Sequence, residues 1–175
     1  TQNSLSVITR SHLLKQEILE ETLFQPPGTP PPPAIETRIT STTPITWHTS
    51  AGLPLVSGGG DLGWFMDLYN TEGGNVSNNG ERMVADPVLR DGKIIFVTLV
   101  PDSDPCRFGG DSWLMEVDAA SGARLPQSPL DLSGDGLFSV ADYVTDSSGA
   151  NVVASGKKSE VGILPAPGIL KDTIV

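Results

Sequence analysis

The sequence predicts a mainly β fold, and two observations lead to that prediction. Glycine and proline are frequent, with 19 Gly and 15 Pro among 175 residues, which is too many for a helical bundle. From residue 36 onward, short apolar stretches with a period of two recur at close spacing. Short strands separated by glycine turns are typical of propellers, sandwiches and barrels.

The first 24 residues are the exception, because their apolar residues recur at helical spacing. Leu14 and Ile18 are four residues apart, as are Leu19 and Leu23, and Lys, Gln and Glu residues supply a polar side. We therefore expect an α-helix within residues 1–24. A helix that packs on the rest of the chain is favoured over one that docks a partner.

Residues 25–36 are expected to form a proline-rich linker. Six prolines fall within residues 25–33. Proline fixes φ and removes a backbone donor, so the segment favours extended polyproline II. We expect a semi-rigid connector between the helix and the β segment, and the alternative is a docking site for a proline-reading module.

Residues 37–175 are expected to form the β segment. The candidate strands span residues 35–43, 63–69, 83–89, 93–100 and 113–118. Asp91-Gly92 lies between two of them and predicts a tight hairpin. Glu81 and Arg82 are expected to form at most an exposed ion pair of little energetic value.

The charge balance limits the partners of the protein. The chain has 11 basic and 21 acidic residues, a formal net charge of -10. An acidic protein of this kind is not expected to bind nucleic acid or an anionic membrane surface. No apolar run approaches the roughly 18 residues that a membrane span requires, and the residues after Thr1 do not have the pattern of a signal peptide.

The most specific chemical pattern lies at residues 131–142 and matches a twelve-residue calcium loop. A hard cation takes six or more oxygen ligands, alternate residues of a tight loop point inward, and glycine at position 6 lets the chain bend. Gly136 occupies that position. The expected ligands, at positions 1, 3, 5, 7, 9 and 12, are Asp131, Ser133, Asp135, the carbonyl of Leu137, Ser139 and Asp142.

Two departures distinguish this loop from a sensor EF-hand. Ser133 is a weaker ligand than Asp or Asn, and Asp142 replaces the usual glutamate with a shorter side chain, as in dockerin-type loops. Two prolines within residues 125–130 exclude an entering helix. We expect a structural Ca²⁺ ion, and the alternative is a Gly-Asp turn that matches the pattern by accident.

Catalytic motifs are absent from the sequence, so no enzymatic activity is expected. The chain has no Gly-x-Ser-x-Gly elbow, no His-Glu-x-x-His motif and no glycine-rich phosphate loop. The single cysteine, Cys106, is interpreted as a buried or half-buried thiol. A bond to a cysteine outside this chain is the next alternative, ahead of a nucleophilic role.

Two resemblances refine the fold class. The strand at 112–118, followed by a turn that ends at Gly122, resembles the blade repeat of quinoprotein-type propellers. Several further segments resemble the C-terminal region of the PilY/PilC family of type IV pilus proteins. These segments are SHLLKQEIL (11–19), GWFMDL (63–68), GERMVADPV (80–88), IFVTLVP (95–101), DPC (104–106), GGDSWL (109–114) and DLSGDG (131–136).

The family resemblance implies the terminal blades of a modified, quinoprotein-like β-propeller without quinone chemistry. It also implies a cell-surface protein at the pilus tip or outer membrane that supports pilus assembly, adhesion and twitching motility. Minor pilins or other pilus components are the implied partners, with a host or abiotic surface as a further target, and calcium is the implied cofactor. The alternatives are a fragment of a quinoprotein-like enzyme, which would need several blade repeats, and a dockerin-like module, which would need a second calcium loop.

Overall fold

The protein folds around one curved sheet of eight strands. The computed structural model describes residues 8–48, 60–70, 78–102, 104, 109–170 and 173–174. Within them the strand order is β3-β1-β2-β10-β7-β6-β4, and β5 also pairs with β6. The strands of this sheet are β1 (Leu14–Phe24), β2 (Ile35–Thr40), β3 (Trp64–Asn70), β4 (Arg82–Met83), β5 (Val88–Arg90), β6 (Lys93–Pro101), β7 (Gly110–Asp118) and β10 (Gly156–Lys158).

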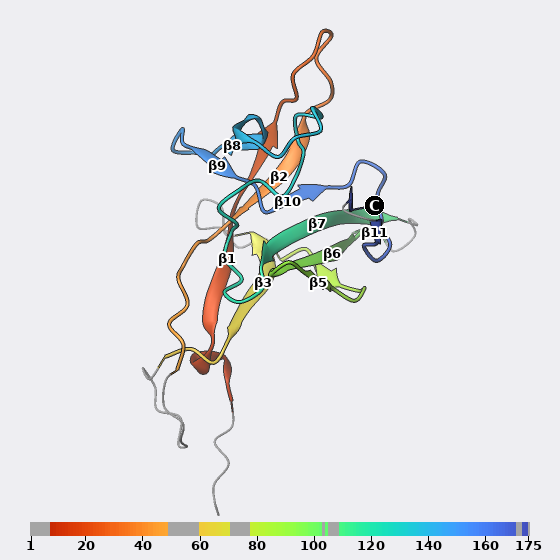
Figure 1. Ribbon diagram of the computed structural model, residues 1–175. Helices are drawn as coiled ribbons and strands as arrows, with labels where there is room; N and C mark the ends of the chain where they lie inside the picture. The colour runs from red at the N-terminus through yellow and green to blue at the C-terminus, as the bar shows by residue number, and fades with distance from the viewer. Residues whose placement is uncertain are drawn as a thin grey trace, which may run out of the picture.

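Among the described residues, the smaller elements are two hairpins and two short 3-10 helices. Figure 1 shows β1 running along the molecule, with β2 beside its upper part and β5, β6 and β7 to one side. β8 pairs with β9, and β11 with β12. These elements are η1 (Arg10–His12), η3 (Val140–Asp142), β8 (Tyr143–Thr145), β9 (Asn151–Val153), β11 (Ile169–Leu170) and β12 (Thr173–Ile174).

The helix predicted within residues 1–24 is wrong, because residues 14–24 form strand β1. β1 lies inside the sheet, antiparallel to β2 and parallel to β3. Gln16 and Ile18 are fully buried two residues apart, as a strand requires, whereas Leu23 is 64% exposed. The gain from pairing on both edges overrides the helix propensity of the Leu, Lys and Glu residues.

The proline-rich segment does not connect a helix to a β segment. It forms the loop of the β1–β2 hairpin, in which Phe24 pairs directly with Ile35. The loop projects from one end of the molecule (Figure 1).

The predicted strands after residue 35 are confirmed, with one division. Residues 83–89 hold two short strands, β4 and β5, both paired with β6. Pro87 precedes β5 and has no N–H for a ladder bond, which accounts for the break. The predicted Asp91-Gly92 hairpin joins β5 to β6, with φ of 49° at Asp91 and 75° at Gly92, as a type I′ turn requires.

Two apolar clusters form the core. The first joins the β1–β2 hairpin to the segments that follow β7, and its buried members are Phe24, Ile39, Leu130, Leu132, Val144 and Ala154. The second lies on β6 and β7, and its buried members are Phe96, Trp113, Met115 and Val117. Trp64, Met66 and Leu68 of β3 pack against the second cluster, so the two ends of the sheet curl toward each other in a nearly closed barrel.

Candidate metal centre

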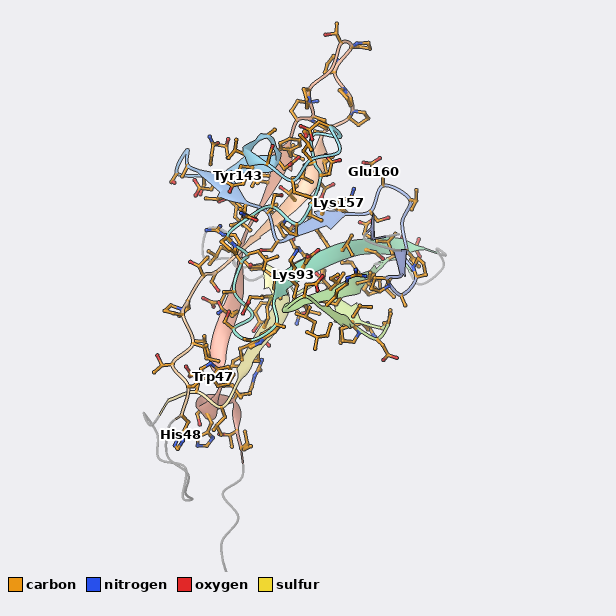
Figure 2. The ribbon with its side chains drawn as sticks, in the orientation of Figure 1. Trp47, His48, Lys93, Tyr143, Lys157 and Glu160 are labelled. Carbon is orange, nitrogen blue, oxygen red and sulfur yellow. The ribbon has the colours of Figure 1, made fainter. Side chains whose placement is uncertain are left out.

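The predicted calcium loop, residues 131–142, is anchored to the first core cluster at both ends. Leu132 is 2% exposed and Val144, two residues beyond the loop, is 1% exposed. Between them, residues 134–138 are all exposed. Figure 2 shows Tyr143, the first residue after the loop, far from Trp47 and His48 at the opposite end of the molecule. The loop therefore has a fixed base and a tip that faces solvent.

Asp131, at position 1, organises the first half of the loop. Its carboxylate accepts hydrogen bonds from the backbone N–H of Gly134 at 2.7 Å and of Gly136 at 2.9 Å. The two glycines have φ of 75° and 79°. A Cβ at either position would meet no atom within 4 Å, so the left-handed backbone, rather than lack of space, requires glycine here.

Asp142, at position 12, closes the loop from inside the protein. It is fully buried, and its carboxylate accepts backbone N–H bonds from Leu132, Ser133 and Ser139, each at 2.9 Å. Burial acts to raise the pKa of this carboxyl, but the N–H donors outweigh burial and hold the pKa below its usual value. Asp142 is therefore a charged side chain whose cost of burial is offset by three hydrogen bonds.

Of the remaining predicted ligands, Asp135 and Leu137 are exposed, whereas Ser133 and Ser139 are half-buried. Asp135 accepts the N–H of Leu137 at 2.8 Å, and Leu137 has its side chain in solvent. Ser139 caps η3, since its Oγ accepts the N–H of Ala141 at 3.1 Å. Ser133 links the two ends of the loop, because its N–H donates to Asp142 and its Oγ donates to Asp131.

The residues fit a calcium ion in their chemistry and in their backbone. All six predicted ligands offer oxygen, and left-handed glycines bend the loop where a calcium loop bends. The carboxylates of Asp131 and Asp142 already accept N–H bonds. Among the described residues, no group of three or more His, Cys, Asp or Glu side chains is arranged to hold a metal ion. The side chains of Asp131, Asp135 and Asp142 are thus not gathered into a three-carboxylate cluster.

A buried ion cluster is the main polar feature that sequence reasoning missed. Arg38 is 1% exposed and donates to Glu81 through Nη1 at 2.6 Å and Nη2 at 2.7 Å. Its Nε and Nη2 also donate to Glu21, and its guanidinium lies 3.9 Å from the ring centroid of Trp113. Glu81 therefore pairs with a residue 43 positions away and not with Arg82. No local pattern signals a pair at that separation.

Two other expectations concern the thiol of Cys106 and the absence of a membrane span. Cys106 lies outside the described residues, so the interpretation of its thiol stays a prediction. In the described part of the chain, no helix has the length and apolar character needed to cross a membrane.

Known proteins resemble this chain in both sequence and fold. No family model matches it. The type IV pilus biogenesis factor PilY1 of Pseudomonas aeruginosa PAO1 is 27% identical over 124 residues, which is 70% of this chain and 10% of that protein. A PilY1 homolog of Xylella fastidiosa is 36% identical over 78 residues, which is 44% of this chain and 6% of that protein.

One solved structure that this chain resembles is the crystal structure of the Pseudomonas aeruginosa PilY1 C-terminal domain. The TM-score is 0.70 at 20% identity, over 92% of this chain and 28% of that domain's chain. The fold thus defines a mainly β segment of the propeller type, as predicted. Together with the sequence matches, it shows that the chain is similar to proteins named PilY1 in both sequence and fold. The chain spans about a tenth of the length of the Pseudomonas relatives.

Proposed function

We propose that the chain is part of a type IV pilus biogenesis protein that acts at the cell surface, at the pilus tip or outer membrane. It supports pilus assembly, adhesion and twitching motility through contacts with minor pilins or other pilus components, and not through catalysis. The observation that carries the proposal is the fold match over 92% of the chain, joined to sequence matches with relatives named as pilus biogenesis factors.

The test is genetic and uses the organism that encodes the chain. Deleting the gene is expected to reduce surface pili and twitching, and a wild-type copy is expected to restore both. The readouts are pili counted by electron microscopy and the diameter of the twitching zone. Unchanged pili and unchanged motility after deletion would contradict the proposal.

We further propose that residues 131–142 bind one structural Ca²⁺. Asp131, Ser133, Asp135, Ser139 and Asp142 would hold the ion through side chains, and Leu137 through its carbonyl. Supporting this are the all-oxygen ligand set at the spacing of a calcium loop, the left-handed Gly136 and the anchored base of the loop. When bound, the ion would neutralise repulsion among the carboxylates and brace the loop.

Asp135 is the residue on which to test calcium binding. Asp131 and Asp142 each hold the loop together through backbone hydrogen bonds, so replacing them would disturb the fold for reasons unrelated to calcium. Asp135 is exposed and accepts one local N–H bond. Asp146 offers a matched control, because it also accepts local N–H bonds in an exposed turn, from Ser148 and Ala150 at 2.9 Å each, outside the loop.

The measurement is calorimetric titration of chelator-treated protein with Ca²⁺, followed by thermal melting. Wild type and Asp146→Ala are expected to bind one equivalent, with stabilisation of about 2.7 kcal/mol at a hundredfold excess of Ca²⁺ over Kd. Asp135→Ala is expected to lose most of that binding while its melting without calcium stays close to wild type. Equal binding by wild type and Asp135→Ala, or none by wild type, would refute the calcium site.

A further inference from the structure

The loop between β1 and β2 is longer than the sheet requires. Phe24 and Ile35 are paired, so a two-residue turn would join the strands at this point. The chain instead inserts residues 25–34, which include six prolines. Connecting the two strands therefore does not explain the length or the composition of the loop.

Residues 27–34, called the proline tip below, are all exposed. The base of the loop is fixed, because Pro26 is buried and Gln25 Nε2 donates to the carbonyl of Pro32 at 2.7 Å. The tip projects beyond the neighbouring β8–β9 hairpin at the end of the molecule (Figure 1). The proline tip is thus open to solvent, and the hydrogen bond from Gln25 to Pro32 restrains its shape.

The four consecutive prolines at positions 30–33 restrict the backbone of the tip. Each ring fixes φ near -65°, and a residue that precedes proline is held in an extended conformation. Pro30, Pro31 and Pro32 therefore favour polyproline II, with three residues per turn. The run offers backbone carbonyls but no N–H donor, so its hydrogen-bonding partners have to be donors.

We propose that the proline tip is a docking site for a protein groove lined by tryptophan and tyrosine side chains. Aromatic rings pack against proline rings, and the indole N–H and phenol O–H donate to backbone carbonyls of the run other than that of Pro32, which accepts from Gln25. Leu23 lies at the base of the loop opposite Glu36 and is 64% exposed, so it extends the apolar surface. Binding costs little conformational entropy because the prolines are restrained beforehand.

The test places a photoreactive amino acid at Leu23 of the full protein, in the cells that make it. The same residue at Leu89, which is 71% exposed on β5, gives the matched control for accessibility. Crosslinked products are resolved by mass, and the crosslinked peptide is identified by mass spectrometry. A second protein carries Pro31→Gly and Pro32→Gly beside the probe, which keeps the carbonyls but removes two proline rings and releases the backbone.

The expected result is one discrete adduct from position 23, absent from position 89, at a partner peptide that contains Trp or Tyr. The two glycine substitutions are expected to reduce the adduct about tenfold, because they remove two proline rings that the aromatic groove would contact and release the restraint on the backbone. The absence of an adduct, an adduct unchanged by the substitutions, or a crosslinked peptide without Trp or Tyr would overturn the proposal. An aromatic partner outside the pilus would support the docking site and count against the pilus function.

Discussion

Charged side chains that are almost completely buried hold this molecule together at the scale of single residues. Arg38 and Glu81 form a bidentate pair within the sheet, and Asp142 lies beneath the loop with three N–H donors. Breaking such an arrangement leaves one partner buried without its counterpart, which costs more than the pair itself contributes.

Replacing Glu81 with Gln is expected to destabilise the protein by about 3–5 kcal/mol, because Arg38 would keep its charge with only Glu21 to balance it. The control is Glu36→Gln, which removes an exposed partner of Lys158 and is expected to change stability by less than about 1 kcal/mol. Urea unfolding at neutral pH measures both. Similar losses of stability in the two variants would show that the buried Arg38–Glu81 pair contributes no more than an exposed ion pair.

Asp142 is expected to make stability depend on pH on the acidic side. Its folded-state pKa lies below the ordinary aspartate value of 3.8. The stabilisation that it contributes is therefore complete above that value and is lost as pH falls through the lower, folded pKa. Asp142→Asn is expected to be less stable than wild type at pH 6 and to lose less stability between pH 5 and pH 2.

The measurement is urea unfolding at a series of pH values for both proteins. Asp131→Asn provides a comparison within the same loop. A variant curve parallel to that of wild type across the acidic range would contradict the role assigned to Asp142.

At the scale of elements, β1 shows how a strand can have the sequence of a helix. Its pairing with β2 shifts register between Ile18 and Glu20, and its pairing with β3 shifts between Gln16 and Ile18. A bulge changes which face later residues occupy, so the period of two does not continue along the strand. What remains in the sequence is the four-residue spacing of two pairs, Leu14 with Ile18 and Leu19 with Leu23, which imitates a helix.

Alanine substitutions can distinguish the strand from the predicted helix. Ile18 is fully buried, and Ile18→Ala is expected to cost about 2–5 kcal/mol. Leu19 is 44% exposed, and Leu19→Ala is expected to cost less than about 1 kcal/mol, although the helical pattern places Leu19 on the same apolar side. Denaturant midpoints measure both, and equal losses would argue for the helix.

The later strands could be predicted because their signals are local. Asp91-Gly92 marks its own turn, and residues 93–100 alternate or remain apolar over most of β6. The pattern at 131–142 is equally local, because its spacing and Gly136 lie within twelve residues, and its calcium ligands stay a prediction. The pairing of Arg38 with Glu81, and of β10 with both β2 and β7, depends on long-range contacts that one sequence does not reveal.

At the scale of the whole molecule, the two core clusters differ in their relation to the loop. Leu132 is part of the loop and Val144 follows it closely, and both belong to the first cluster. The second cluster, on β6 and β7, contains no loop residue. A ligand that orders the loop should therefore stabilise the part of the molecule around the first cluster more than the part around the second cluster.

Calcium is expected to slow amide hydrogen exchange unevenly. The proposed ion should protect the loop, β8 and β9 most strongly, and β5 and β6 least, because local opening is suppressed where the ion binds. Exchange measured by mass spectrometry with and without Ca²⁺ provides the map. Asp135→Ala should lose the difference, and greater protection at β5 and β6 than at the loop would contradict the assignment.

The position of β10 has a kinetic consequence. It lies between β2 and β7 in the sheet although it comes after both in the chain. The β1–β2 hairpin and the β5–β6–β7 meander can each form from neighbouring residues, and among the described strands it is β10 that joins them through ladder hydrogen bonds. During synthesis, the edge of β2 in one half of the sheet and the edge of β7 in the other would stay unpaired until residues 156–158 emerge from the ribosome. Assembly of the sheet is therefore a late step governed by long-range loop closure, which is slow, and it exposes the nascent chain to aggregation until then.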